Sequence, residues 1–278
     1  MLGIVDVGGG TRDVYGAGVL DYLMDNGIKA DLFIGVSAGS ANGATYIAGQ
    51  RGRNYRFYNR YAFRKEYMGF RNLLRRGSYI NLEYIYGTLS NSGGEDPFDY
   101  DGFIENPAQF IVVATDAFTG GPKYFDKSDM GRDHYETLMT SSCVPAVNRP
   151  YVFKGKPYYD GGISDPIPFD KAFEMGCDKV VVILTRPKTA FRKPKSDNRI
   201  SRFVEMSYPE AARALRVRCD TYNEELSRAI ELEKEGRLLI LAPADIKNMK
   251  TLTLDRLQIN RMYREGYADA SAVSEYLK

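Results

Sequence analysis

The chain of 278 residues is long enough for one large domain or two modest ones, and its 44% hydrophobic residues can fill a core. A formal net charge of +2 provides no overall attraction for nucleic acid, and no nucleic-acid partner is expected. One histidine and three widely spaced cysteines argue against a histidine-based zinc site and a disulfide framework, so no metal is expected.

Short apolar segments alternate with helical patterns from the start of the chain. The pattern predicts strands at residues 2–7, 30–36, 109–117 and 179–185, and helices at 14–26, 38–48, 135–142 and 168–176. The sequence predicts two strand pieces joined by a tight turn within residues 151–162, and a loop at residues 88–102. Continuous apolar strands that alternate with helices favour a three-layer α/β/α fold with a mainly parallel central sheet.

The pattern changes after Pro187. Residues 189–199 are polar and basic and predict a linker, followed by a long helix at 208–236, a strand at 237–243 and a mainly helical remainder. We therefore predict a first domain of residues 1–186 and a C-terminal extension of residues 187–278. The chain starts without a basic leader and apolar stretch, and no run approaches the ~18 apolar residues of a membrane helix. The expected location is the cytoplasm, and peripheral contact with a membrane surface is compatible with the sequence.

The segment GVSAG places Ser37 between an apolar strand and a helix of small residues. This is the context of a nucleophilic serine on a sharp strand-to-helix turn, where Gly35 and Gly39 avoid crowding the serine. The helix N-terminus favours a developing negative charge at this position. The alternative interpretation is a glycine-rich turn with a helix-capping serine.

A second glycine turn, Gly8-Gly9-Gly10 followed by Thr11 and Arg12, comes directly after the first strand. Its exposed backbone N–H groups could hold an anion. A dinucleotide loop would need glycine where Asp13 stands, and a P-loop would need Gly-Lys-Ser/Thr. The remaining interpretations are an oxyanion hole that serves Ser37, or a tight turn without a ligand.

The third motif is Asp160-Gly161-Gly162, at the end of a predicted strand. Two glycines allow another loop to approach the aspartate closely, although a turn aspartate is the commoner role of Asp-Gly.

In this order, the three motifs resemble those of the patatin-like phospholipases, and specifically a bacterial branch. Residues 112–125 and 140–150 are also similar to that family, and the resemblance spans residues 2–186. It implies a patatin-like catalytic domain with a Ser–Asp dyad of Ser37 and Asp160. It also implies an oxyanion hole of Gly8, Gly9 and Gly10, and no cofactor. Arg12 would support this loop or meet a lipid phosphate.

The implied activity is hydrolysis of a carboxylic ester of a fatty acid through an acyl-enzyme. The expected substrate is a phospholipid or lysophospholipid. An acyltransferase with the same dyad and a catalytically idle lipid-binding module are the alternatives. His134 lies far from every motif in the sequence and is interpreted as a surface or structural residue.

Two further features bear on the substrate. The family usually has glycine after the arginine of the oxyanion loop, whereas this chain has Asp13, which would either repel anionic groups or cap the following helix. Residues 51–76 hold nine basic residues and seven aromatic ones. They suit a lid or docking surface for anionic lipid, or alternatively aromatic core packing with arginines reaching outward. Nucleic-acid binding is a third interpretation, but no base-reading motif accompanies the charge.

Overall fold

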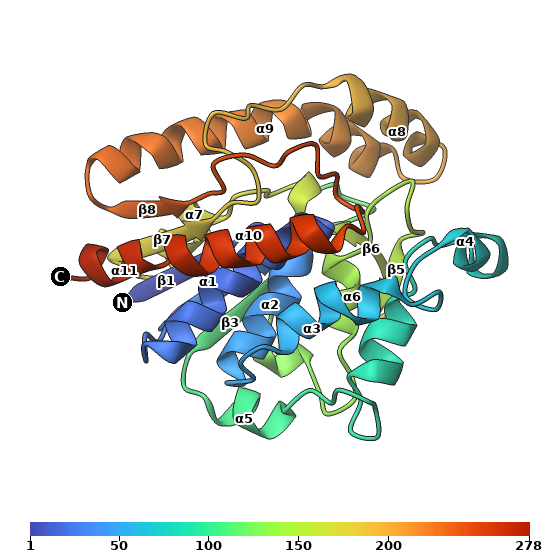
Figure 1. Ribbon diagram of the computed structural model, residues 1–278. Helices are drawn as coiled ribbons and strands as arrows, with labels where there is room; N and C mark the ends of the chain where they lie inside the picture. Colours follow the sequence, from blue (N-terminus) through green and yellow to red (C-terminus); the bar gives the residue numbers. More distant parts are fainter.

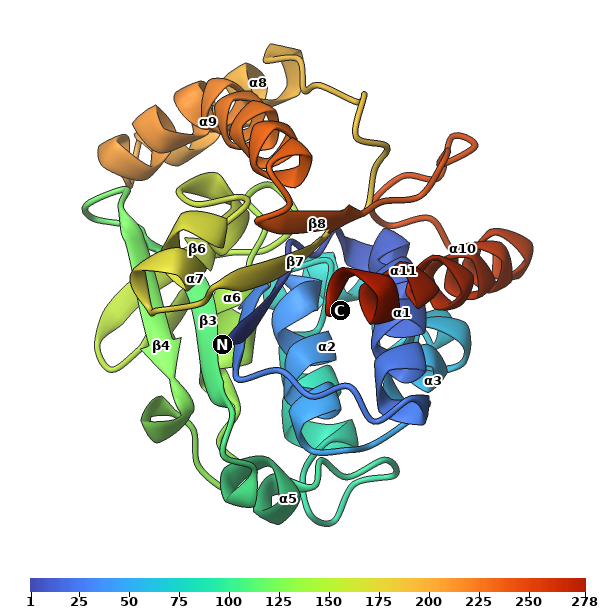
Figure 2. The same cartoon turned by 90° about the vertical axis from the view of Figure 1, so that its left-hand side faces the viewer.

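The central sheet organises the whole chain in the computed structural model, which describes residues 1–278 except the side chains of Lys195 and Ser196. Its eight strands follow the order β5-β6-β3-β2-β1-β7-β8, with β4 paired to β3. Their bounds are β1 Leu2–Asp6, β2 Leu32–Val36, β3 Gln109–Asp116, β4 Pro122–Asp126, β5 Tyr151–Phe153, β6 Lys156–Asp160, β7 Lys179–Ile183 and β8 Leu238–Leu241. Most of these strands are labelled in Figure 1, and β4 is labelled in Figure 2.

The middle of the sheet is parallel. Strand β1 pairs in parallel with β2 and β7, β2 pairs in parallel with β3, and β7 pairs in parallel with β8. The antiparallel pairs among these strands are β4 with β3, β6 with β3 and β5 with β6. Successive strand residues serve opposite faces, so Ile4 and Phe33 join one buried cluster while Val5 and Ile34 join the other.

Helices cover both faces of the sheet (Figure 2). Helices α1 (Val14–Asp25), α2 (Ala38–Ile47) and α10 (Arg256–Asp269) lie on one face, and α7 (Phe169–Glu174) and α9 (Pro209–Lys234) lie on the other. This arrangement confirms the predicted three-layer α/β/α fold with a mainly parallel sheet.

The C-terminal residues are joined closely to this core. Strand β8 extends the sheet, and α10 crosses α1 so closely that a Cβ on Gly18 would lie 2.1 Å from the Tyr263 carbonyl oxygen. The Tyr15 hydroxyl donates to Asp269 at 2.7 Å across the same contact. The division between residues 186 and 187 stays a prediction.

Part of the predicted linker at 189–199 is helical, because α8 spans Lys195–Glu205 and packs on α9. The remaining helices are α3 (Arg53–Asn59), α4 (Phe70–Arg76), α5 (Tyr100–Glu105), α6 (Glu136–Ser141) and α11 (Ser271–Tyr276), and a π-helix occupies Glu83–Leu89. Within the described chain, no helix combines the length and apolar character that crossing a bilayer requires.

Candidate active site

Ser37 occupies the sharp turn between β2 and α2. Its backbone angles, φ 56° and ψ −127°, are unusual for a residue with a side chain. The flanking glycines permit this turn, since a Cβ on Gly35 would lie 2.3 Å from Ser40 Cα and one on Gly39 would lie 2.3 Å from the Asp6 carbonyl oxygen. The Ser37 amide donates to Ser141 Oγ at 2.7 Å, which fixes the turn to helix α6.

Asp160 ends β6 and faces the same turn. Its side chain accepts a hydrogen bond from the Gly162 amide at 2.9 Å, and the Ser37 side chain is close enough to lower the pKa of its carboxyl. Gly161 lets the chain approach β3, because a Cβ there would lie 2.2 Å from the Val113 carbonyl oxygen. Strands β2 and β6 both flank β3, and their ends therefore bring Ser37 and Asp160 together.

Asp160 is 4% exposed, and this burial raises the pKa of its carboxyl above the ordinary value. The positive charge of Arg218 opposes the increase, as do the nearby Ser37 side chain and the hydrogen bond from the Gly162 amide. An aspartate in this environment is a better proton acceptor than an exposed one.

The three glycines of the first turn lie beside this pair. Gly8, Gly9 and Gly10 have φ values of 64°, 142° and 60°, a region that residues with side chains rarely adopt. All three line one cavity with Ser37 and Asp160. Among the described residues, no acceptor pairs with the amide groups of Gly9 and Gly10, which leaves these donors available to an anion.

Two segments from elsewhere in the chain hold this turn. The Thr185 hydroxyl donates to the Gly8 carbonyl oxygen at 2.7 Å, and the Thr11 amide donates to the Thr251 carbonyl oxygen at 2.8 Å. Thr251 belongs to the C-terminal extension, which therefore contributes to the walls of the site.

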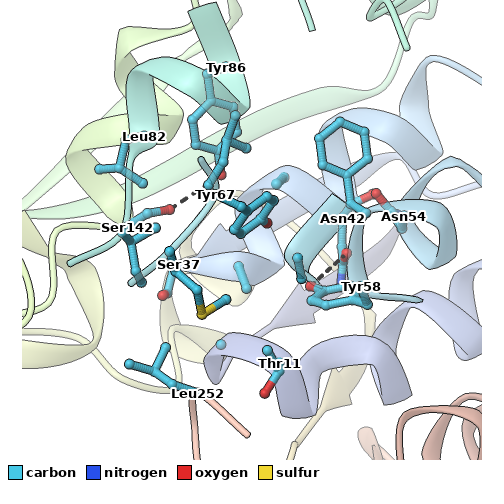
Figure 3. Close-up of a pocket in the computed structure, with 18 of the residues that line it drawn as sticks. Thr11, Ser37, Asn42, Asn54, Tyr58, Tyr67, Leu82, Tyr86, Ser142 and Leu252 are labelled. Carbon is cyan, nitrogen blue, oxygen red and sulfur yellow. Dashed lines mark hydrogen bonds between the residues drawn. The ribbon is translucent and has the colours of Figure 1, made fainter. Parts of the chain in front are cut away.

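Ser37 lines two different cavities. The first, of about 100 Å³, is mainly apolar and is enclosed by α2, α3 and the segments around the π-helix (Figure 3). Tyrosine hydroxyls at its wall are used internally, since Tyr58 donates to Asn42 Oδ1 at 3.2 Å. This cavity could accept an alkyl chain whose end is attached at Ser37.

The second cavity, of about 200 Å³, is polar and contains Asp160, the glycine turn and Arg12. Arg12 is 4% exposed, and its Nε has no hydrogen-bond partner among the described residues. Burial and the nearby positive charge of Arg186 together lower the pKa of Arg12 to about 10. The side chain stays protonated at neutral pH and places a positive charge in this cavity.

Asp13 lies outside both cavities. It is fully buried beneath the glycine turn and faces Asp6, and it makes no capping hydrogen bond to α1. Neither sequence-based expectation for Asp13 fits this position, because the carboxyl neither borders the substrate side nor caps the helix.

His134 is separate from the candidate site. Its side chain is 74% exposed and its Nδ1 lies 3.1 Å from Glu136 Oε1. It lines neither of the two cavities that contain Ser37.

Residues 51–76 divide into two parts. Phe57 and Tyr58 are buried and line the apolar cavity, as the core-packing interpretation expects, but Arg53 is buried beside them and does not reach outward. Helix α4, in contrast, exposes Phe70 and Leu74 at 75% and 88%.

Several residues of the polar cavity were not singled out from the sequence. Arg186, Arg192 and Arg218 line it together with Arg12. They come from the segment after β7 and from α9, where the sequence shows only a basic linker and a charged helix. Among the described residues, no cluster of three His, Cys, Asp or Glu side chains is arranged to hold a metal ion.

Comparisons with known proteins identify relatives for both parts of the chain. A family model described as patatin-like phospholipase matches residues 7–173, and one described as a domain of unknown function (DUF6363) matches residues 208–278. The uncharacterized protein YjjU of Escherichia coli (strain K12) is 29% identical over 208 residues, which cover 73% of this chain and 57% of YjjU. This chain thus spans little more than half the length of that relative.

Among solved structures, VipD from Legionella pneumophila superimposes with a TM-score of 0.49 and 14% sequence identity, covering 98% of this chain and 66% of VipD. The patatin-like match at residues 7–173 extends over more than half of the chain and contains Ser37 and Asp160. The chain therefore belongs to the patatin-like phospholipase family.

Proposed function

We propose that the protein is a serine hydrolase of fatty-acid esters, with phospholipids or lysophospholipids as substrates. Family membership indicates lipid acyl hydrolysis in general terms. The observation that carries the finer proposal is the position of Ser37, beside a buried Asp160 and between an apolar and a polar cavity. An acyl chain would enter the first cavity, and the alcohol part of the ester would lie in the second.

In the first half of the reaction, Ser37 Oγ attacks the acyl carbonyl carbon and its proton passes to Asp160. The amide groups of Gly9 and Gly10 stabilise the negative charge on the carbonyl oxygen. The ester C–O bond then breaks, and the departing alcohol takes the proton from Asp160. Ser37 is left esterified to the fatty acid.

In the second half, water attacks the acyl-enzyme and transfers a proton to Asp160. The bond between the acyl carbon and Ser37 Oγ breaks, and the serine oxygen recovers a proton from Asp160. The fatty acid leaves, and the enzyme returns to its starting state. An alcohol or lysolipid in place of water would make the same site an acyltransferase.

The dyad is tested with Ser37→Ala and Asp160→Asn on a p-nitrophenyl ester. Each change should lower kcat at least about 1000-fold, because each removes a group that takes part in bond making or proton transfer. His134→Gln is the control and should retain activity. Loss of activity in the histidine variant with an unchanged circular dichroism spectrum would contradict the dyad.

Product analysis with an added alcohol acceptor distinguishes hydrolysis from acyl transfer. We expect free fatty acid as the main product even when a lysolipid acceptor is present. A fluorophosphonate probe should label Ser37, and its failure to do so would favour a lipid-binding module without catalysis.

We also propose that α4 is the part of the chain that meets a lipid surface. Phe70 and Leu74 are exposed on it, and Arg71, Arg75 and Arg76 are exposed beside them. The helix lies at the periphery of the molecule, away from the sheet (Figure 1). Exposed apolar and basic side chains on one element suit the boundary of an anionic bilayer.

A further inference from the structure

The polar cavity at Ser37 is lined by four arginines that converge from distant parts of the sequence. Arg12 comes from the turn after the first strand, Arg186 and Arg192 follow β7, and Arg218 lies on α9. The only carboxylates in the lining are Asp160 and Asp197, so the described lining carries a surplus of two positive charges when all six groups are ionised.

Three of these guanidinium groups have one nitrogen, Nε, that is left without a hydrogen-bond partner by the described residues. The Nε atoms of Arg12, Arg186 and Arg192 are buried and have no hydrogen-bond partner among the described residues. Buried charged donors are normally paired, because leaving them unpaired carries a large desolvation cost. Their convergence on one cavity therefore points to an anionic ligand.

The cluster is held in place by specific contacts. Asn223 fixes the segment after β7 at both backbone groups of Arg192, accepting from its amide at 2.8 Å and donating to its carbonyl oxygen at 3.2 Å. The Arg192 guanidinium lies 4.3 Å from the centre of the Tyr222 ring. Arg218 Nε donates to the Gly162 carbonyl oxygen at 2.6 Å, which links the cluster to the Asp160 turn.

Mutual repulsion is visible in the cluster. Burial lowers the pKa of Arg192 to about 9, and the positive charges of Arg218 and Arg186 contribute to the decrease. A bound dianion would offset this repulsion between the guanidinium groups that line the cavity.

We propose that Arg12, Arg186, Arg192 and Arg218 bind a phosphomonoester on the alcohol part of the substrate, which makes the preferred substrate an acyl ester of a phosphorylated alcohol. A phosphomonoester carries between one and two negative charges at neutral pH, which matches the charge surplus of the cavity. A zwitterionic headgroup would add a cation to a lining that is already positive. This assignment rests on the proposed hydrolase function of Ser37.

The test compares hydrolysis of 1-acylglycerol 3-phosphate, 1-acylglycerol and 1-acylglycerophosphocholine with the same acyl chain. We expect kcat/KM for the phosphomonoester to exceed that for the neutral ester at least about 30-fold. Arg186→Gln and Arg192→Gln should reduce this ratio to within about threefold, and the corresponding lysine variants should give intermediate ratios. Arg213→Gln is the matched control, because Arg213 is exposed on α9 and lines neither cavity.

A second measurement does not depend on catalysis. Inorganic phosphate titrated into the protein in a calorimeter should bind, and Arg186→Gln and Arg192→Gln should weaken this binding at least about tenfold. If the protein binds inorganic phosphate but hydrolyses 1-acylglycerol 3-phosphate no faster than 1-acylglycerol, the site would be assigned to free phosphate and the headgroup assignment would be overturned. Equal phosphate binding by wild type and variants would overturn the anion site itself.

Failure of the hydrolase proposal would give a result different from failure of the headgroup assignment and from failure of the anion site. In that case the wild type would hydrolyse none of the three esters, and phosphate calorimetry alone would decide the arginine site. A wild type that hydrolyses the neutral and phosphomonoester substrates equally would instead retain the hydrolase function and overturn the headgroup assignment.

Discussion

Asp13 and Asp6 face each other beneath the glycine turn, and both are fully buried. The two carboxyls come close together beside Gly16: a Cβ atom added to this glycine would lie 2.6 Å from Asp13 Oδ1 and 2.7 Å from Asp6 Oδ2. Asp6 accepts hydrogen bonds from the Gly8 amide at 3.1 Å and from Asn42 Nδ2 at 3.3 Å. Among the described residues, neither Asp13 oxygen has a donor other than the partner carboxyl. We therefore infer that Asp13 is protonated and donates a hydrogen bond to an ionised Asp6.

This pair predicts how the stability of the protein depends on pH. Burial raises the pKa of Asp6 to about 6. Burial and the adjacent negative charge of Asp6 together raise the pKa of Asp13 well above its ordinary value. In the unfolded chain both carboxyls titrate near ~3.9. The folded state binds more protons above that pH, so the free energy of unfolding should fall as pH rises from 4 through 6 and beyond.

Asp13→Asn should reduce this dependence, because an amide can donate to Asp6 without a titratable proton. We expect its free energy of unfolding to fall less between pH 5 and 8 than that of the wild type. At pH 8 the variant should be the more stable protein by on the order of 1 kcal/mol. Urea denaturation at several pH values measures this, with Asp220→Asn on the exposed side of α9 as the control. Parallel curves for wild type and Asp13→Asn would show that the pair carries no proton.

The pH dependence of catalysis should respond to Arg218. Asp160 must be ionised to accept the serine proton, so activity should fall as pH decreases through its pKa, which burial raises. The charge of Arg218 is the largest influence that opposes this increase. Arg218→Gln should therefore move the acidic limb of kcat/KM to higher pH.

A neutral ester such as p-nitrophenyl butyrate is the appropriate substrate for this profile, in buffers free of phosphate. Arg213→Gln on the same helix should leave the acidic limb where it is in the wild type. An unchanged limb in Arg218→Gln, or a shift to lower pH, would exclude Arg218 as an influence on the base.

The sequence allowed prediction of the layered fold and of the two turns that carry Ser37 and Asp160. At these turns the chemistry is local: Gly35 and Gly39 are needed within two residues of Ser37, and Gly161 and Gly162 directly follow Asp160. Requirements of this kind involve residues that are adjacent in the sequence, so a short motif reveals them.

The arginine cluster could not be predicted in the same way. Arg12, Arg186, Arg192 and Arg218 are brought together only by the order of strands and the crossing of α9, and each resembles an ordinary solvated charge in its own segment. For the same reason the basic stretch at 51–76 did not reveal which of its residues are core and which are surface. Arg53 is buried and contacts Ser90 and Asp96, residues about forty positions away in the chain.

The apolar cavity predicts a dependence on acyl length. Ala41 lies on α2, one turn after Ser37, and lines this cavity. Ala41→Leu should fill space that two or three methylene groups of a long acyl chain would occupy. At about 0.8 kcal/mol per methylene, kcat/KM for dodecanoyl esters should fall roughly 10- to 50-fold relative to butanoyl esters. Ala214→Leu, on α9 and outside both cavities, is the control for an added side chain. The same chain-length preference in Ala41→Leu and wild type would place the acyl chain elsewhere.

Helix α4 predicts binding to anionic vesicles. Arg71, Arg75 and Arg76 are exposed on it, next to the exposed side chains of Phe70 and Leu74. Each basic residue near an anionic bilayer contributes about 1 kcal/mol, so replacing all three arginines with glutamine should weaken sedimentation with phosphatidylglycerol vesicles at least about tenfold at low salt. Added salt should weaken binding of the wild type in the same way, because it screens these charges.

The matched control replaces Lys29, Lys234 and Lys278 with glutamine. These three lysines are exposed, and the chain end and the end of α9 lie on the opposite side of the molecule from α4 in Figure 1. This variant has the same net charge as the α4 variant, so a difference in vesicle binding between them reports the location of the charge and not its amount. Equal sedimentation of the α4 variant and the wild type would mean that the three arginines serve the structure of the protein alone, and that lipid reaches Ser37 from another face.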